Sequence, residues 1–253
     1  MRFKTFSVEP RKGIMNKKIE WVSTKLLELF FPQRCPFCDG VLGGREKICK
    51  SCRKKICYVQ EPRCYRCGKG LAQAGEELCK DCQTKHHDFT KGYSLYTYES
   101  VKDSLYRFKF HDRPAYASVY AWEVRNHLPE LKALEIECII PVPMYPPKER
   151  RRGYNQAGEI AKYLGKELAI PVNRHLLVRK KKTRPMKELG PAERQINLRN
   201  AFHIRANDVK LRSILLVDDI YTTGATLDAC SRILRASGVQ KIYFVTLASG
   251  KGI

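Results

Sequence analysis

The sequence predicts an α/β protein built on a parallel sheet and preceded by a small cysteine-rich module. Three observations predict this fold class. Nine of the eleven cysteines fall between Cys35 and Cys82, and eight of the nine form C-x-x-C pairs. Further along the chain, apolar strand-like runs alternate with helix-like patterns, which is typical of parallel sheets with crossover helices. One of the apolar runs leads directly into two aspartates and a turn rich in threonine and glycine.

The chain of 253 residues is long enough for one ordinary domain and a small one. We predict an N-terminal tail and helix over 1–34, a cysteine-rich module over 35–88 and an α/β domain over 89–253. In the first segment, apolar residues recur at steps of three and four, as on one face of a helix. They are Ile19, Val22, Leu26, Leu29 and Phe30. This face is expected to pack on its own domain, and binding to a membrane surface or a partner is the alternative.

Four C-x-x-C pairs make up the cysteine-rich module. One such turn places two sulfurs on a metal ion, and a second turn ~10–20 residues later completes a tetrahedron around zinc. The spacing predicts two structural zinc ions with four cysteines each. The repeated layout favours sequential pairing, and an interleaved arrangement is the alternative. In the sequential arrangement, Cys35, Cys38, Cys49 and Cys52 hold one ion, and Cys64, Cys67, Cys79 and Cys82 hold the other.

Disulfides are the competing interpretation of these cysteines. The N-terminus has basic residues but no apolar stretch of the kind that a signal peptide needs, so we expect a cytoplasmic protein with reduced thiols. No apolar run approaches the ~18 residues of a membrane span. Cys57, His86 and His87 lie outside the repeat and are expected to be bystanders.

The protein is strongly basic, with a net charge of +22 from 48 lysines and arginines against 26 acidic residues. Two zinc ions with four thiolates each would leave roughly +18. Such a charge favours polyanions and phosphorylated small molecules without specifying which of them binds.

The α/β domain is predicted from three apolar strands and two amphipathic helices. The strands are expected at 138–142, 214–217 and 241–247. One helix carries Ala157, Ile160, Ala161, Leu164 and Leu168 on a single stripe, and the other carries Leu227, Cys230, Ile233 and Leu234. In parallel sheets, ligands bind at the carboxyl ends of the strands. The loops that follow the strands at 138–142 and 214–217 are therefore the candidate binding loops.

The loop over 218–226 suits a phosphorylated sugar. Its threonine hydroxyls and the backbone N–H groups at a helix N-terminus can donate to phosphate oxygens, and Gly224 allows close approach of the backbone. The two adjacent carboxylates of Asp218 and Asp219 can accept hydrogen bonds from ribose hydroxyls. A Walker loop is absent from the sequence, which argues against an ordinary NTPase.

The stretch ILLVDDIYTTGAT at 214–226 resembles the signature of the type I phosphoribosyltransferases. In that family the loop holds the ribose-5-phosphate part of 5-phosphoribosyl-1-pyrophosphate (PRPP), which binds with Mg²⁺, and the acids lie at the ribose hydroxyls. The resemblance implies these roles for Asp218, Asp219, Thr222, Thr223, Gly224, Ala225 and Thr226.

The loop after 138–142 carries PVP at 141–143 and then RRGYNQ at 151–156. Together with the cysteine-rich front, this pattern is similar to the ComF family, which is associated with natural competence and DNA uptake. The resemblance spans 26–247. It implies that this loop faces the pyrophosphate of PRPP. The residues concerned are Arg152, Gly153, Tyr154 and Asn155, with Arg152 as a catalytic residue beside Asp218 and Asp219.

The polar stretch over 179–202 resembles the flexible flap of the same family, which closes over the pyrophosphate. Its matching positions are Thr183, Leu189, Arg194, Asn197, Ala201 and Phe202. Met186 stands where relatives of this family tend to carry glutamine. The pair Lys109-Phe110 also matches a family stretch, without an assigned role.

Two functions follow as hypotheses. The first is an enzyme that transfers a phosphoribosyl group to an acceptor that the sequence does not identify. The second is a non-catalytic competence factor, or a PRPP-responsive regulator acting through a partner such as the competence machinery, that keeps the PRPP site. Cationic and aromatic residues of the zinc module would suit single-stranded DNA in the second case. They are Arg53, Lys54, Lys55, Arg63, Tyr65 and Arg66.

Overall fold

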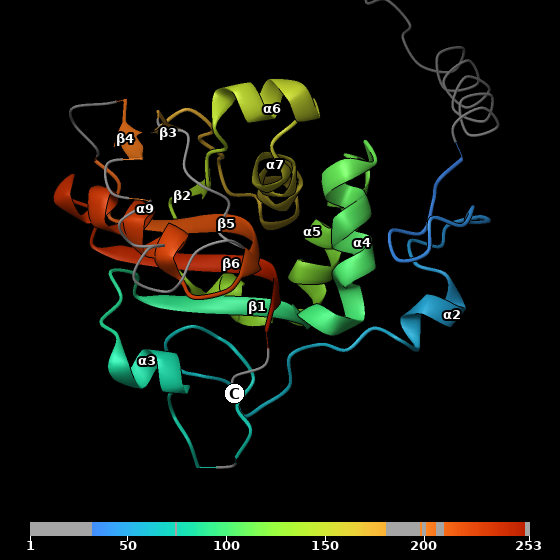
Figure 1. The fold of residues 1–253 in the computed structure, drawn as a ribbon, viewed down its shortest axis with the longest axis horizontal. Coiled ribbons are helices and arrows are strands. Elements are labelled where there is room, and N and C mark those ends of the chain that lie inside the picture. The colour runs from blue at the N-terminus through green and yellow to red at the C-terminus, as the bar shows by residue number, and fades with distance from the viewer. Residues whose placement is uncertain (1–31, 74, 181–197, 199–200, 206–209, 251–253) are drawn as a thin grey trace, which may run out of the picture.

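The computed structural model describes residues 32–73, 75–180, 198, 201–205 and 210–250 (Figure 1). The helix predicted at 19–30 lies outside this part of the chain. So does most of the predicted flap, including Thr183, Met186, Leu189, Arg194 and Asn197. Within the described ranges, no helix combines the length and the apolar character that a membrane crossing needs.

A four-stranded parallel sheet forms the centre of the α/β domain, in the order β1-β6-β5-β2. The strands are β1 (Lys91–Thr97), β6 (Lys241–Ser249), β5 (Ser213–Tyr221) and β2 (Cys138–Pro141). The predicted parallel sheet is confirmed, and three of its strands lie where the apolar runs indicated. Because all four strands run in one direction, their carboxyl ends meet at one edge, where such sheets bind ligands.

Side chains along β5 alternate between two apolar layers. Leu215 and Val217 pack in the core that includes α4, α5 and α7, whereas Ile214 and Leu216 pack in the core that includes α9. These helices are α4 (Tyr98–Phe110), α5 (Tyr116–His127), α7 (Gln156–Leu168) and α9 (Ala225–Ala236), drawn in Figure 1. Covering both faces explains why the sequence of β5 is continuously apolar rather than alternating.

Both predicted helical stripes are confirmed by burial. In α7 the buried residues include Ala157, Ile160, Ala161 and Leu164, and in α9 they include Leu227, Cys230 and Leu234. The residue before α7 is Asn155, whose side-chain oxygen accepts a hydrogen bond from the backbone N–H of Ala157 at 3.2 Å. Such a cap fixes the first turn of a helix, so the chain enters α7 in a defined direction.

Shorter elements lie around the sheet. They are the 3-10 helix η1 (Pro129–Ala133), the helix α6 (Pro146–Arg152), and the antiparallel pair of β3 (Leu177–Arg179) and β4 (Phe202–Ile204). The helix α6 ends at Gly153, whose φ of 90° lies in the left-handed region that glycine adopts without strain.

The two halves of the cysteine-rich module pack on different parts of the α/β domain. They contain the short helices α2 (Lys50–Arg53) and α3 (Lys80–Thr84). In the first half, the carbonyl of Pro36 accepts a hydrogen bond from the Ser104 hydroxyl of α4 at 2.6 Å. In the second half, the cysteines share a core with Phe89 and Tyr221. Each half therefore buries its apolar groups against the larger domain rather than in a core of its own.

Candidate functional site

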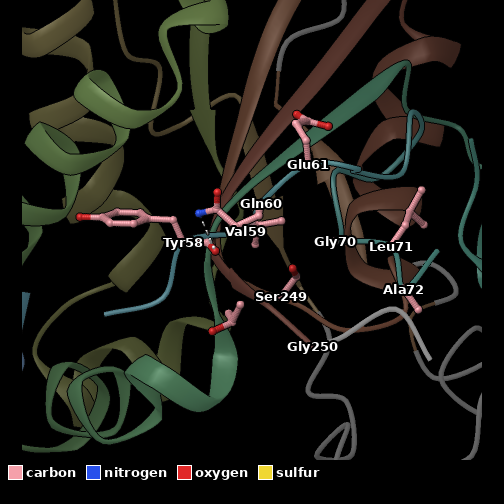
Figure 2. Close-up of a pocket in the computed structure, with 10 residues that line it drawn as sticks. Tyr58, Val59, Gln60, Glu61, Gly70, Leu71, Ala72, Ser249 and Gly250 are labelled. Carbon is pink, nitrogen blue, oxygen red and sulfur yellow. Dashed lines mark hydrogen bonds between the residues drawn. The ribbon is translucent and has the colours of Figure 1, made fainter. Parts of the chain in front are cut away.

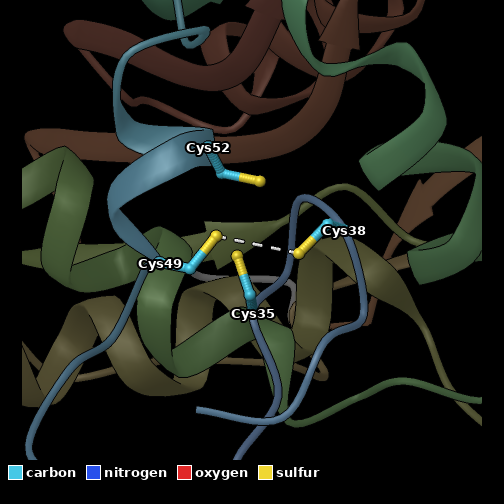
Figure 3. A group of neighbouring side chains, drawn as sticks. All are labelled: Cys35, Cys38, Cys49 and Cys52. Carbon is cyan, nitrogen blue, oxygen red and sulfur yellow. Dashed lines mark hydrogen bonds between the residues drawn. The ribbon is translucent and has the colours of Figure 1, made fainter. Parts of the chain in front are cut away.

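The eight cysteines of the repeat form two groups of four. Within each group, all four sulfurs lie within 4.8 Å of one another. Figure 3 shows the sulfurs of the first group, Cys35, Cys38, Cys49 and Cys52, turned toward a common centre. The second group consists of Cys64, Cys67, Cys79 and Cys82, and all four are buried. The sulfurs are grouped in sequential order, so the interleaved alternative is wrong.

The geometry of both groups fits zinc. With Zn–S bonds of about 2.3 Å, two sulfurs of a tetrahedron lie about 3.8 Å apart. The Cys38 and Cys49 sulfurs are 3.8 Å apart, and the Cys67 and Cys79 sulfurs are 3.7 Å apart. A hydrogen bond with the Ser51 hydroxyl lowers the pKa of Cys49 to about 6, which favours the metal-binding thiolate. Four cysteine ligands leave no open coordination position, so such sites are structural.

The three expected bystanders lie outside both sulfur groups. Within the described residues, neither Cys57 nor the histidines at 86 and 87 belong to a cluster that could hold a metal ion. Cys57 and His86 are exposed, whereas His87 is buried beside Asp228 of α9. His87 therefore has a structural partner that the sequence did not indicate.

The predicted sugar-phosphate loop joins β5 to α9 at the carboxyl edge of the sheet. Gly224 precedes the helix with a φ of 77°, in the left-handed region. A Cβ atom at this position would lie 2.7 Å from the Tyr221 hydroxyl oxygen, so only glycine fits without displacing that ring. Thr222 is exposed and Thr223 is partly exposed. The turn thus places two threonines that solvent reaches directly before a helix N-terminus, an arrangement that suits an anion.

The two aspartates at the end of β5 have different surroundings. The Asp219 carboxylate forms an ion pair with Lys109 of α4, with 2.8 Å between Nζ and Oδ2. The Asp219 backbone N–H donates to Asp218 Oδ1 at 2.8 Å. Burial and the neighbouring Asp219 charge raise the pKa of Asp218 to about 7. Lys109, which had only an unassigned sequence match, is thereby placed in the site.

Four cationic side chains surround the aspartates. The pKa of Lys148 is lowered by desolvation and by three nearby positive charges, those of Arg152, Arg179 and Lys109. The Asp219 charge opposes the lowering of the pKa of Lys148 and of Arg152, and the Asp218 charge does the same for Arg179. Lys148 is exposed and the other three are partly exposed. Such a concentration of positive charge is stable only beside acids or a bound anion. Sequence reasoning missed Lys148, because a lysine at the start of a basic run normally lies on a solvated face.

The predicted pyrophosphate-facing residues divide into one site side chain and three that support the fold. Arg152 donates to Gln156 Oε1 at 2.6 Å, and its guanidinium lies 4.9 Å from the ring centroid of Phe110. Gly153 ends α6, and Asn155 caps α7 and donates to the Val142 carbonyl. The buried Tyr154 hydroxyl donates to the Phe108 carbonyl. Among these four, only Arg152 has its side chain among the cations of the site.

A stability measurement against pH tests the surroundings of Asp218. A carboxyl whose pKa is about 7 when folded and 3.8 otherwise stabilises the fold only while it is protonated. Stability from this group is therefore lost as the pH rises from 3.8 to about 7. We expect ligand-free Asp218→Asn to unfold a few degrees above the wild type at pH 8, since 1 kcal/mol is worth about 2–4 °C here. At pH 5 the gain should be smaller. A gain that is equal at both pH values, measured by thermal denaturation beside the wild type, would contradict this assignment.

A cavity of 370 Å³ lies between the cysteine-rich module and the sheet (Figure 2). Its lining includes Tyr58, Gln60 and Leu71 from the module side and Ser249 at the carboxyl end of β6. Ser249 is the register partner of Tyr221, which ends β5. The Ser249 hydroxyl oxygen is buried and has no hydrogen-bond partner among the described residues. The cavity is large enough for a small molecule and shares the sheet edge with the sugar-phosphate loop.

Two protein families match the chain. The family described as "Double zinc ribbon domain" matches residues 26–83, and the family described as "Phosphoribosyl transferase domain" matches residues 150–252. These matches cover the two sulfur groups and the β5–α9 loop described above. The fold and the site thus define a zinc-ribbon protein with a phosphoribosyltransferase domain.

Sequence similarity to known proteins extends over most of the chain. "Competence protein F" of Haemophilus influenzae is 34% identical over 87% of this chain and 98% of its own length. The chain therefore belongs to the ComF family. "Competence protein ComFC" of Bacillus subtilis is 29% identical over 78% of this chain and 82% of its own. "DNA utilization protein YhgH" of Escherichia coli is 26% identical over 85% of this chain and 96% of its own.

Proposed function

We propose that this protein binds PRPP together with Mg²⁺ at the carboxyl edge of its sheet and transfers the phosphoribosyl group to an acceptor in the cytoplasm. The observation that carries the proposal is the meeting of a phosphate-binding turn, two aspartates and four cations at this edge. A phosphorylated sugar with a pyrophosphate group offers hydroxyls to the acids and anionic oxygens to the turn and to the cations.

In this proposal the turn holds the 5-phosphate and the acids hold the ribose hydroxyls. The residues are Asp218, Asp219, Thr222, Thr223, Gly224, Ala225 and Thr226. The loop with Arg152, Gly153, Tyr154 and Asn155 faces the pyrophosphate, with Arg152 contributing its side chain and the other three their backbone. Lys109 and Lys148 add two cations to this side of the site.

The transfer breaks the bond between ribose C1 and the pyrophosphate oxygen, and the pyrophosphate leaves with the electron pair. A nucleophilic atom of the acceptor forms the new bond to C1 and releases its proton. Positive charge around the leaving group stabilises this transition state, and Arg152 and Lys148 are placed to supply it. Mg²⁺ bound with PRPP would neutralise further charge on the pyrophosphate.

The acceptor is proposed to bind in the 370 Å³ cavity. Ser249 and Tyr221 are register partners on neighbouring strands, so the cavity opens one strand away from the sugar-phosphate loop. Ser249, Gln60 and Thr97 bring polar side chains to the lining of this cavity. This placement favours a small polar acceptor over a macromolecule.

Calorimetric titration with PRPP, with and without Mg²⁺, tests the binding half of the proposal. We expect Mg²⁺-dependent binding with one site per chain. A screen for pyrophosphate release across candidate acceptors then tests the transfer. Absence of PRPP binding would refute the whole proposal, whereas binding without release for any acceptor would leave the regulatory alternative.

A second candidate function, binding of single-stranded DNA, is favoured by an aromatic surface beside the site. Tyr106 and Phe110 of α4 are each 58% exposed, and their ring centroids are 4.9 Å apart. Lys109 lies between them in sequence, and the Arg152 guanidinium packs on Phe110. Exposed rings next to cations provide stacking platforms for unpaired bases. The names of the competence and DNA utilization relatives support a role in DNA uptake.

On the zinc ribbon side, Arg53, Lys54 and Lys55 are exposed, as a DNA surface requires. Tyr65 is 66% exposed beside Lys91. By contrast, Arg66 donates to the carbonyls of Phe89 and Thr90, so its guanidinium is already used within the fold.

Salt separates DNA binding from PRPP binding. We expect affinity for a single-stranded oligonucleotide to fall steeply between 50 and 200 mM salt, as it does for phosphate-backbone contacts, whereas PRPP affinity changes much less. Tyr106→Ala with Phe110→Ala should weaken DNA binding at least tenfold, since each stacked base is worth about 1–3 kcal/mol. Tyr65→Ala, measured in parallel, reports the contribution of the ribbon side. Finding no DNA binding even at low salt would remove this candidate.

A further inference from the structure

His87 connects the second sulfur group to the sugar-phosphate loop. The residue follows α3 in the segment that leaves Cys82, and it is only 3% exposed. Its Nδ1 lies 2.7 Å from Asp228 Oδ2, and the backbone N–H of Asp88 donates to Asp228 Oδ1 at 3.0 Å. Asp228 lies in the first turn of α9, where its backbone N–H donates to the Gly224 carbonyl. One carboxylate thus joins two segments that are separated by 140 residues in the chain.

The same segment lies directly under the phosphate-binding turn. A Cβ atom at Gly224 would be 3.3 Å from His87 Cε1 and 2.7 Å from the Tyr221 hydroxyl oxygen. The Tyr221 ring stacks on Phe244, and Lys69 of the second zinc ribbon lies 5.3 Å from its centroid. The space beneath the turn is therefore filled by His87 and Tyr221, both of which pack against the ribbon side of the molecule.

Further contacts hold α9 to the same segment along its length. Arg232 forms an ion pair with Asp88 at 3.0 Å, and Arg235 donates to the Asp88 carbonyl and to the Thr90 hydroxyl. The position of α9 relative to the ribbon is thus set at both ends, with the His87–Asp228 contact at the end that carries the phosphate-binding N–H groups.

We propose that His87 and Asp228 are a positioning pair through which the second zinc ribbon holds the sugar-phosphate loop in its binding geometry. This inference rests on the proposed function of that loop. A turn that is already ordered binds its ligand more tightly, because binding no longer has to order it. His87 does not act on the substrate directly, because its side chain is 1% exposed. Nor does it belong to either sulfur group.

The test measures two ligands that use opposite sides of the site. Ribose 5-phosphate probes the turn at 222–226, and pyrophosphate with Mg²⁺ probes the Arg152 side. In calorimetry we expect His87→Ala to weaken ribose 5-phosphate about tenfold and to change pyrophosphate less than twofold. His87→Asn, whose amide can still donate to Asp228, should regain most of the lost affinity. The exposed neighbour provides the matched control, His86→Ala, which should bind both ligands as the wild type does.

Zinc content is measured for every variant, and two ions per chain are expected throughout. Unchanged ribose 5-phosphate affinity in His87→Ala would overturn the inference. Equal weakening of both ligands would overturn it as well, since general destabilisation would then explain the loss. If His87→Ala does not fold, Asp228→Asn replaces it, with the same expected selectivity and the same contrary outcomes.

Hydrogen exchange separates this inference from the proposed function, because it requires no ligand. In the ligand-free variant, the amides of 222–228 should exchange about tenfold faster than in the wild type, and those of α7 should not change. If this exchange pattern is found but the wild type binds neither ribose 5-phosphate nor PRPP, the proposed function is refuted and the positioning role is not. Equal exchange in variant and wild type would overturn the positioning role alone.

Discussion

Replacing both Asp218 and Asp219 with asparagine is expected to abolish Mg²⁺-dependent PRPP binding, with a loss of at least about 100-fold. A hydrogen bond to a charged group is worth about 1.5–3 kcal/mol, and two such groups would be lost at the ribose hydroxyls. The substitution also leaves Lys109 without its ion-pair partner, 2.8 Å away in the wild type. Calorimetry with the purified double variant measures the effect.

Pyrophosphate binding supplies the internal control for this double variant. The amide is close in shape to the carboxylate, so the fold and the zinc content should be retained. Removing two negative charges leaves the cations Lys148 and Arg152 unopposed, so pyrophosphate should bind at least as tightly as before. Undiminished PRPP affinity would refute the assignment of the aspartates, and loss of both ligands would indicate a damaged site rather than a missing ribose contact.

The second large effect is expected from Cys67→Ser in the second sulfur group. Zinc content should fall from two ions to one per chain, and the thermal midpoint should fall by more than about 10 °C. Structural zinc contributes apparent binding free energies of about 10–16 kcal/mol in zinc-finger peptides. The Cys67 side chain is fully buried, in the same core as Phe89 and Tyr221. Metal analysis and thermal denaturation measure the two effects.

Cys57→Ser is the matched control for this cysteine substitution. Cys57 is exposed and lies outside both sulfur groups, so two zinc ions and an unchanged midpoint are expected. Cys35→Ser in the first group should also remove one ion, with its main structural effect near α4, where the ribbon turn contacts Ser104. Retention of two zinc ions by Cys67→Ser would contradict the four-cysteine site.

The local parts of the candidate site, each within one short stretch of sequence, could be located from the sequence alone. The sequential sulfur groups follow from C-x-x-C turns about ten residues apart, because short loops bring such pairs together with little freedom. The strand at 214–217 and the helix after Gly224 follow from apolar periodicity. The acid pair and the turn that follows it could be found without information from elsewhere in the chain.

The parts that depend on pairing between distant segments were not predicted. Lys109 meets Asp219 across 110 positions, and His87 meets Asp228 across 141. Nothing in the local sequence of either partner indicates the other. The buried hydroxyl of Tyr154 likewise donates to the distant Phe108 carbonyl, a contact that its motif did not indicate.

The sequence by itself determined the chemical groups of the candidate sites: two sets of four thiols that fit zinc, and an acidic strand end followed by a turn rich in threonine and glycine. The tertiary structure decided which cations surround the acids and which segment supports the turn. The physical reason is that bonding within a short loop depends on local spacing. The packing of α4 and the second ribbon against the sheet depends on the whole core.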